Sequence, residues 1–164
     1  MNRDIEILAT EVLSAARAGS LKIATAESCT GGLIAGALTA IAGSSDVVDR
    51  GFVTYSNEAK EQMLGVSTQT LDKFGAVSGA TAKEMAYGAL ANSLADITVS
   101  VTGIAGPGGG TTEKPVGTVW FGLAMQGVAP VSECVHFGDI GRNSIRDHTV
   151  VHALKMLNTV IKTL

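Results

Sequence analysis

Apolar residues recur at helical spacing near both ends of the chain. One face of the first predicted helix is formed by residues three or four positions apart, namely Ile5, Leu8, Val12 and Ala16. Gly19 follows this face and is suited to end the helix. The last helix is predicted to start near Asn143 and to keep the same apolar spacing as far as Leu164. Helices therefore open and close the sequence.

Five short apolar runs between these helices have the composition of strands, and they are LKIATA, RGFVTYS, ITVSVTG, VGTVWFGLAM and PVSECVHF. The third run is almost continuously β-branched, as expected of a buried parallel strand. The last two are joined by QGVA, which has the length of a hairpin turn. Helical segments separate the first three runs. This order predicts a three-layer α/β fold whose sheet is mixed, mostly parallel, with one antiparallel strand. We expect a single domain over residues 1–164.

Three further helices are predicted between the strands. The segment GGLIAGALTAIA is apolar around its whole circumference, which favours a helix buried by other layers. Asn57 is placed to cap a short helix with the sequence EAKEQML. Ser78 is placed to cap a longer helix, whose inner side is expected to carry Met85, Leu90 and Leu94.

Composition narrows the class of protein. Charged residues make up 16% of the chain against about 25% in ordinary proteins, which favours a sheet covered on both faces or a surface hidden in a homodimer. A net charge of −3 gives no general attraction to nucleic acid or acidic membranes.

The two cysteines form no CxxC pair, and no apolar run reaches the roughly 20 residues that span a bilayer. With no signal-like N-terminus, we expect a cytoplasmic protein without a membrane partner.

Polar residues follow the predicted parallel strands where each strand ends. The first strand ends at Glu-Ser-Cys-Thr, the second at Tyr-Ser-Asn and the third at Thr-Gly. Ligands of α/β sheets bind outside the carboxyl ends of such strands. The sequence therefore predicts that Ser28, Tyr55 and Thr102 lie at one edge of the sheet.

Ser28 is the best nucleophile candidate at this edge. It lies between a strand and a predicted helix start, where backbone N–H groups can stabilise an oxyanion. No histidine is near the first three strand ends, so Lys60 is the candidate base, which requires burial to lower its pKa. Tyr55 could relay the proton or hold the lysine. Each of these residues alone has an ordinary role in capping, packing or solvation; their meeting at one edge favours a serine–lysine site.

Two other chemistries are weaker. Cys29 adjoins Ser28, but without a histidine partner it is expected to pack as a small apolar residue. His148 and His152 are spaced to reach one metal ion, with His136 as a third ligand from a strand. The segment between the first two lacks the glutamate of the HExxH pattern. We therefore expect no metal site.

Two segments could contact an anionic ligand. The loop GIAGPGGGTTEKP matches neither a Rossmann nor a P-loop pattern, and it either faces a ligand with its backbone N–H groups or only connects two strands. Arg142 and Arg146 flank the start of the last helix and would suit a phosphate. The alternative is that these arginines pair with Asp139 or Asp147 at the surface.

Five ordered segments, TAESCTGG, GFVTYSNEAK, GAVS, TGIAGPGGG and EKPVGTVWFG, resemble the CinA C-terminal domain family over nearly the whole chain. The resemblance implies a three-layer α/β/α fold with a five-stranded mixed sheet. It also implies hydrolysis of the carboxamide of nicotinamide mononucleotide (NMN) to nicotinate mononucleotide and ammonia, with neither metal nor cofactor. Many relatives carry a further N-terminal domain resembling molybdopterin-binding proteins, and we expect this chain to begin directly at the amidase unit. The alternative function is a non-catalytic nucleotide-binding or regulatory module.

The resemblance also implies roles for individual residues. Ser28 in ESCTGG corresponds to the nucleophile, and Tyr55 and Lys60 in YSNxxK to further catalytic groups. Substrate-binding residues are expected to be Thr30, Gly31, Gly32, Thr102, Gly103 and Arg146. The family often has GDR followed closely by an Ile/Val-Arg pair, whereas GDIGRNSIR is two residues longer here. Either Arg142 or Arg146 could therefore bind the phosphate, and Arg146 is favoured because it keeps the Ile-Arg step.

Overall fold

Five strands form one mixed sheet, and the computed structural model describes all of residues 1–164. In chain order the strands are β1 (Ile23–Glu27), β2 (Val48–Val53), β3 (Ile97–Gly103), β4 (Thr118–Met125) and β5 (Val128–His136). Their spatial order is β2-β1-β3-β4-β5. β1 is parallel to β2 and β3, whereas β4 is antiparallel to both of its neighbours. The predicted five-stranded sheet with one antiparallel strand is confirmed.

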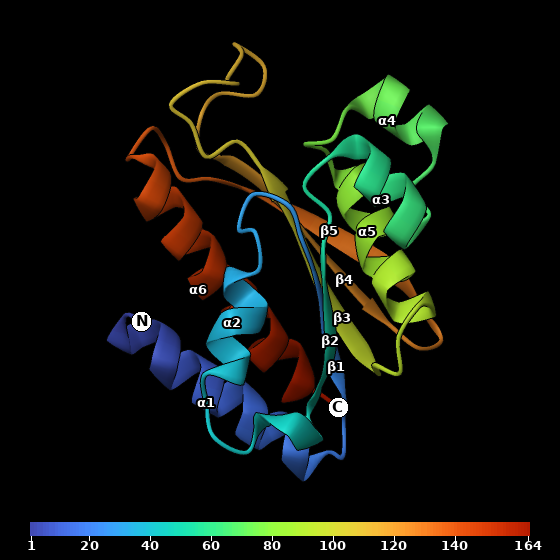
Figure 1. Ribbon diagram of the computed structural model, residues 1–164, viewed down its shortest axis with the longest axis vertical. Coiled ribbons are helices and arrows are strands. Elements are labelled where there is room, and N and C mark those ends of the chain that lie inside the picture. The colour runs from blue at the N-terminus through green and yellow to red at the C-terminus, as the bar shows by residue number, and fades with distance from the viewer.

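Helices cover both faces of this sheet. They are α1 (Arg3–Ala18), α2 (Leu33–Thr39), the short 3-10 helix η1 (Ser44–Asp46), α3 (Asn57–Leu64), α4 (Thr68–Phe74), α5 (Gly79–Ala91) and α6 (Arg142–Ile161). Figure 1 shows α1, α2 and α6 on one side of the sheet and α3, α4 and α5 on the other. This arrangement confirms the three-layer α/β/α fold. None of the helices combines the length and apolar character needed to cross a membrane.

The hydrophobic core is larger on the α1–α2–α6 side of the sheet. A cluster of 24 buried residues fills that side, whereas a second cluster of 6 lies on the side of α3, α4 and α5. β1 runs between the two layers and is buried at every position, because both of its faces are covered. Its last residue, Glu27, is therefore a carboxylate inside the protein, 1% exposed. Such a group needs a compensating set of hydrogen bonds.

Two expectations about the helices are wrong. α2 is short and only partly buried: it packs against α1, α6 and the strands β1 and β2, but its outer face is uncovered, and Leu33 on that face is 40% exposed. Leu94 is 70% exposed rather than inside, because α5 ends at Ala91 and Asn92 closes it by donating to the Gly88 carbonyl. The helix α4 was not predicted; it is capped by Ser67, which accepts a hydrogen bond from the Thr70 N–H.

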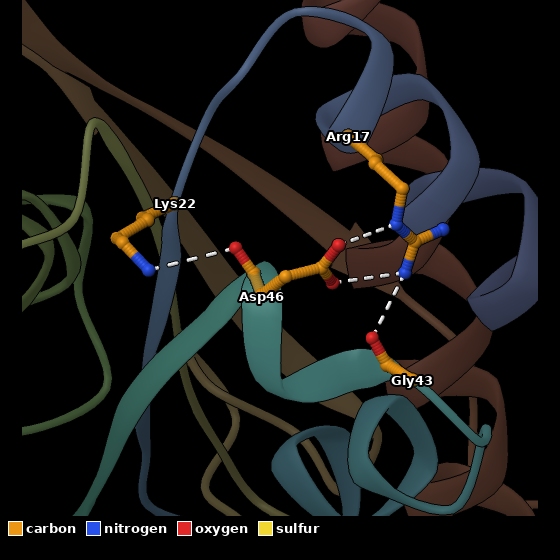
Figure 2. A network of polar contacts seen from close by, with 4 residues as sticks. All are labelled: Arg17, Lys22, Gly43 and Asp46. Carbon is orange, nitrogen blue, oxygen red and sulfur yellow. Dashed lines mark hydrogen bonds and ion pairs between the residues drawn. The ribbon is translucent and has the colours of Figure 1, made fainter.

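A polar network lies at the edge of the sheet where the parallel strands begin (Figure 2). Arg17 at the end of α1 donates to both carboxylate oxygens of Asp46, at 2.6 and 2.9 Å, and to the Gly43 carbonyl at 3.0 Å. Lys22, just before β1, reaches the Asp46 carbonyl at 3.5 Å. The hydrogen bond from Arg17 lowers the pKa of Asp46. The network connects the α1–β1 turn to η1, at the edge opposite the candidate site.

Candidate active site

Ser28 and Lys60 meet just beyond the carboxyl end of β1. Lys60 Nζ lies 3.1 Å from Ser28 Oγ. The same amine donates to the carbonyl oxygens of Thr54 at 3.0 Å and Tyr55 at 3.4 Å. Lys60 is 1% exposed and Ser28 is 8% exposed. A potential nucleophile and a potential base, 32 residues apart in the chain, thus share one buried contact.

Local structure explains how Lys60 reaches this place. Ser56, rather than the predicted Asn57, caps α3 by accepting a hydrogen bond from the Ala59 N–H at 3.0 Å. Lys60 lies one turn into this helix and is buried beneath it. Burial lowers the pKa of the Lys60 amine, and no carboxylate forms an ion pair with it. Both conditions favour the neutral amine that a general base requires.

Backbone hydrogen bonds hold the turn that follows Ser28. The Ser28 N–H donates to the Val101 carbonyl, and the Gly31 N–H donates back to the Ser28 carbonyl, each at 3.0 Å. Gly31 and Gly32 have positive φ angles of 58° and 106°, which suit glycine. The Thr30 side chain donates to Glu27 and is fully buried. Thr30, Gly31 and Gly32 therefore shape the turn and lie outside the cavity lining.

A cavity of about 210 Å³ opens beside the Ser28–Lys60 contact. Its polar lining includes Tyr55, Thr102 and Arg142, and Gly103 lies next to Thr102 in the same wall. The Thr102 hydroxyl donates to the Ala76 carbonyl at 2.8 Å and so attaches the wall segment around Ala76 to β3. The cavity is smaller than the roughly 300 Å³ at which ligand sites usually begin, so it has room for one part of a larger molecule.

The two arginines occupy different places. Arg142 lines the cavity and donates to the Gly106 carbonyl at 2.8 Å and to the Tyr55 hydroxyl at 3.2 Å. Arg146 does not line the cavity; it donates to the carbonyls of Cys29 at 3.0 Å and Thr30 at 3.2 Å. Neither arginine forms an ion pair with an aspartate. Of the two residues, Arg142 is therefore the one beside the space where a ligand would lie.

The surroundings of Cys29 and of the three histidines do not favour a cysteine nucleophile or a metal site. Cys29 is buried, and burial raises the pKa of its thiol to about 11, so the thiolate is scarce near neutral pH. No group of three potential metal ligands is found. His148 contacts the Ser144 carbonyl, His152 packs on the Phe121 ring, and His136 lies 3.3 Å from the Thr118 hydroxyl. The three histidines thus have separate environments.

Only the first part of the glycine-rich loop lines the cavity beside Ser28 and Lys60. Ala105 belongs to the cavity lining, whereas residues 107–112 line a larger open groove of about 690 Å³ on the outside of the loop. That groove is the roomier of the two, but it contains no nucleophile beside a base. Sequence reasoning missed Ala76 and Val77, which form the apolar wall of the cavity. They lie in the segment GAVS, so a usable signal was present in the sequence.

The fold and the cavity define a three-layer α/β protein with a cavity at the carboxyl edge of its parallel strands. The profile of the CinA C-terminal domain matches residues 5–161. The Escherichia coli (strain K12) protein named nicotinamide-nucleotide amidohydrolase PncC is 50% identical over 152 residues, which cover 92% of this chain and 90% of that protein. A competence-damage inducible protein of Caldicellulosiruptor bescii is 49% identical over 158 residues. The match covers 96% of this chain but 38% of that longer relative.

A solved structure agrees with these matches. The crystal structure of the competence/damage inducible protein CihA from Agrobacterium tumefaciens is similar with a TM-score of 0.95 and 55% sequence identity. The similarity covers 99% of this chain and 98% of that one. The chain belongs to the CinA C-terminal domain family.

Proposed function

We propose that this protein hydrolyses the carboxamide of a nicotinamide nucleotide, with NMN as substrate and nicotinate mononucleotide and ammonia as products. The named activity of the E. coli relative, which matches over 92% of this chain, supports the substrate class. The buried contact of 3.1 Å between Ser28 Oγ and Lys60 Nζ supports the mechanism and is the observation that carries the proposal. Neither a metal nor a cofactor takes part in the proposed reaction.

The contacts of Lys60 fit a neutral amine. Its two N–H bonds donate to the carbonyls of Thr54 and Tyr55, which leaves the nitrogen lone pair for the hydroxyl hydrogen of Ser28. The Ser28 oxygen bonds to the carboxamide carbon while its proton moves to Lys60. When the C–N bond breaks, Lys60 returns the proton to the departing nitrogen, and ammonia leaves. Water then hydrolyses the acyl ester on Ser28 by the same proton path.

Backbone donors stand next to the nucleophile. The N–H groups of Cys29 and Thr30 have no acceptor within the chain, whereas the Gly31 N–H is already used by the Ser28 carbonyl. Free donors beyond a nucleophilic serine suit the oxygen that becomes negatively charged after attack. We assign the oxyanion to the Cys29 N–H, because Cys29 lines the cavity whereas Thr30 and the two glycines after it lie outside the lining.

The rest of the nucleotide extends from the cavity toward Arg142. The nicotinamide ring fits between the apolar wall of Ala76 and Val77 and the end of β3, with its carboxamide at Ser28. The phosphate then lies outside the 210 Å³ space, where the Arg142 guanidinium is the nearest cation of the lining. In this arrangement Arg142, and not Arg146, binds the phosphate.

Ammonia release from NMN tests the proposal. The wild-type protein is expected to release ammonia and nicotinate mononucleotide in equal amounts, and Ser28→Ala to lose turnover while keeping its fold. Ser144→Ala is a matched control, because Ser144 lies on α6 outside the cavity lining. Turnover that survives in Ser28→Ala would rule out the serine mechanism. Tight binding of NMN without ammonia release would instead identify a non-catalytic nucleotide-binding module.

A further inference from the structure

Glu27 carries a buried carboxylate without a cationic partner. The residue is 1% exposed and takes part in none of the ion pairs of the protein. Its Oε1 accepts hydrogen bonds from Thr30 Oγ1 at 2.5 Å and from the Ile34 N–H at 2.9 Å, and its Oε2 accepts one from the Ala35 N–H at 3.0 Å. Burying a charge is costly unless donors converge on it. Here all three donors come from the segment that directly follows Ser28.

Arg146 holds the same turn from α6. Its Nε donates to the Cys29 carbonyl at 3.0 Å, and a terminal nitrogen donates to the Thr30 carbonyl at 3.2 Å. A Cβ added to Gly31 would lie 3.5 Å from the same guanidinium, so the turn packs against it. Every hydrogen bond that this arginine makes goes to the main chain of the turn.

These contacts orient the backbone beside the nucleophile. In a trans peptide the carbonyl and the following N–H point in opposite directions. Since the Ser28 carbonyl accepts the Gly31 N–H inside the turn, the Cys29 N–H points the other way, and it donates to no other residue although Cys29 is buried. Buried N–H groups are nearly always paired. Cys29 also lines the cavity, so this unpaired donor directly after Ser28 is available to a ligand.

We propose that Glu27 and Arg146 are positioning residues of the reaction. Together they fix the turn 28–32, so that the Ser28 hydroxyl faces Lys60 and the Cys29 N–H faces the oxygen that becomes an oxyanion. Neither residue touches the substrate. The inference rests on the proposed amidase function and gives Arg146 a role in the rate of the chemical step instead of phosphate binding.

Steady-state kinetics with NMN tests this role through Glu27→Gln, Arg146→Met and Arg146→Lys. Losing a positioned oxyanion donor, or displacing a nucleophile by about 1 Å, costs on the order of 100-fold in rate. We expect Glu27→Gln and Arg146→Met to lower kcat by about 100-fold with KM changed by less than about threefold. Arg146→Lys keeps one donor and is expected to recover about tenfold of that loss. The matched control is Arg50→Met, because Arg50 also donates to a main-chain carbonyl, that of Asn92 at 3.1 Å, but lies in β2 away from the cavity.

Each contrary result has a defined meaning. A raised KM with unchanged kcat in Arg146→Met would overturn the inference and show that this arginine binds the substrate. Unchanged kinetics in Arg146→Met and Glu27→Gln would also overturn it, as would loss of the folded state in all three variants by circular dichroism.

A second readout keeps the inference separate from the choice of substrate. Covalent labelling of Ser28 by a fluorophosphonate, followed by mass spectrometry, uses the hydroxyl and the oxyanion donors without needing a nicotinamide. If the wild type labels but releases no ammonia from NMN, the proposed substrate fails and the labelling rates of the variants still decide the positioning role. Equal labelling of wild type and Arg146→Met would overturn the inference.

Discussion

The guanidinium of Arg142 and the hydroxyl of Tyr55 lie 3.2 Å apart at the candidate cleft, although 87 residues separate them in the chain. A second nitrogen of the same guanidinium donates to the Gly106 carbonyl at 2.8 Å. One side chain thereby connects the end of β2, the loop after β3 and the start of α6. A phosphate arriving here would meet a cation that is already held in place, which lowers the entropy cost of binding.

Replacement of Arg142 by methionine should weaken substrate binding. A hydrogen bond to a charged group contributes about 1.5–3 kcal/mol, so KM for NMN is expected to rise by about 10- to 100-fold with a smaller change in kcat. Nicotinamide riboside, which lacks the phosphate, should be used equally poorly by wild type and variant. A variant that discriminates against the phosphate-free substrate as strongly as the wild type would contradict this assignment.

The pH dependence of the reaction should report the state of Lys60. Its pKa is lowered from the ordinary value of 10.5 because the amine is buried. In the proposed mechanism the neutral amine is the active form, so kcat/KM should rise with pH through a midpoint below 10.5 and then level off. Lys60→Arg should remove this rise together with the activity, since guanidinium stays charged. Lys22→Arg is the control at the opposite edge of the sheet, and activity retained in Lys60→Arg would count against lysine as the base.

Cys29 should be dispensable for chemistry. Burial raises the pKa of its thiol to about 11, so the thiol stays protonated near neutral pH. Cys29→Ala is expected to keep kcat within about tenfold of wild type, because a small buried side chain is removed beside an intact hydroxyl. Iodoacetamide at pH 7.5 should label the half-buried Cys134 before Cys29. Loss of turnover in Cys29→Ala as complete as in Ser28→Ala would show that the thiol takes part.

Packing of α5 against the end of α3 should depend on Gly88. A Cβ added there would lie 1.9 Å from the Leu64 carbonyl oxygen, which belongs to the helix that carries Lys60. Gly88→Ala must therefore separate the two helices, and we expect a loss of at least about 3 kcal/mol in the free energy of unfolding.

Gly36→Ala is the matched control for this change. No atom lies within 4 Å of an added Cβ at Gly36, which is an exposed position of α2. The substitution should stabilise the protein by about 0.5–1 kcal/mol through helix propensity. Chemical denaturation measures both variants, and equal stability of the two alanine substitutions would contradict the close contact at Gly88.

The convergence of Ser28, Tyr55 and Thr102 could be predicted because it depends on topology. Parallel strands end at the same edge of a sheet, so residues that follow such strands are neighbours whatever the details of packing. Lys60 could be added because it lies one turn into the helix after the second strand. Burial of its amine was only a requirement of the hypothesis, since burial depends on how α3 and α5 pack. The predictions of a homodimer, a cytoplasmic location and a single domain over residues 1–164 stay predictions.

By itself the sequence determined the order of the strands and of all helices except η1 and α4, the mixed sheet and the edge at which polar residues gather, because these follow from periodicity and strand direction. The tertiary structure decided which arginine faces the cavity, since Arg142 and Arg146 differ by about one helical turn and point to different neighbours. It also decided that Glu27 turns inward to bind the segment after Ser28. Side-chain direction and burial arise from contacts between distant segments, and spacing along the chain does not contain them.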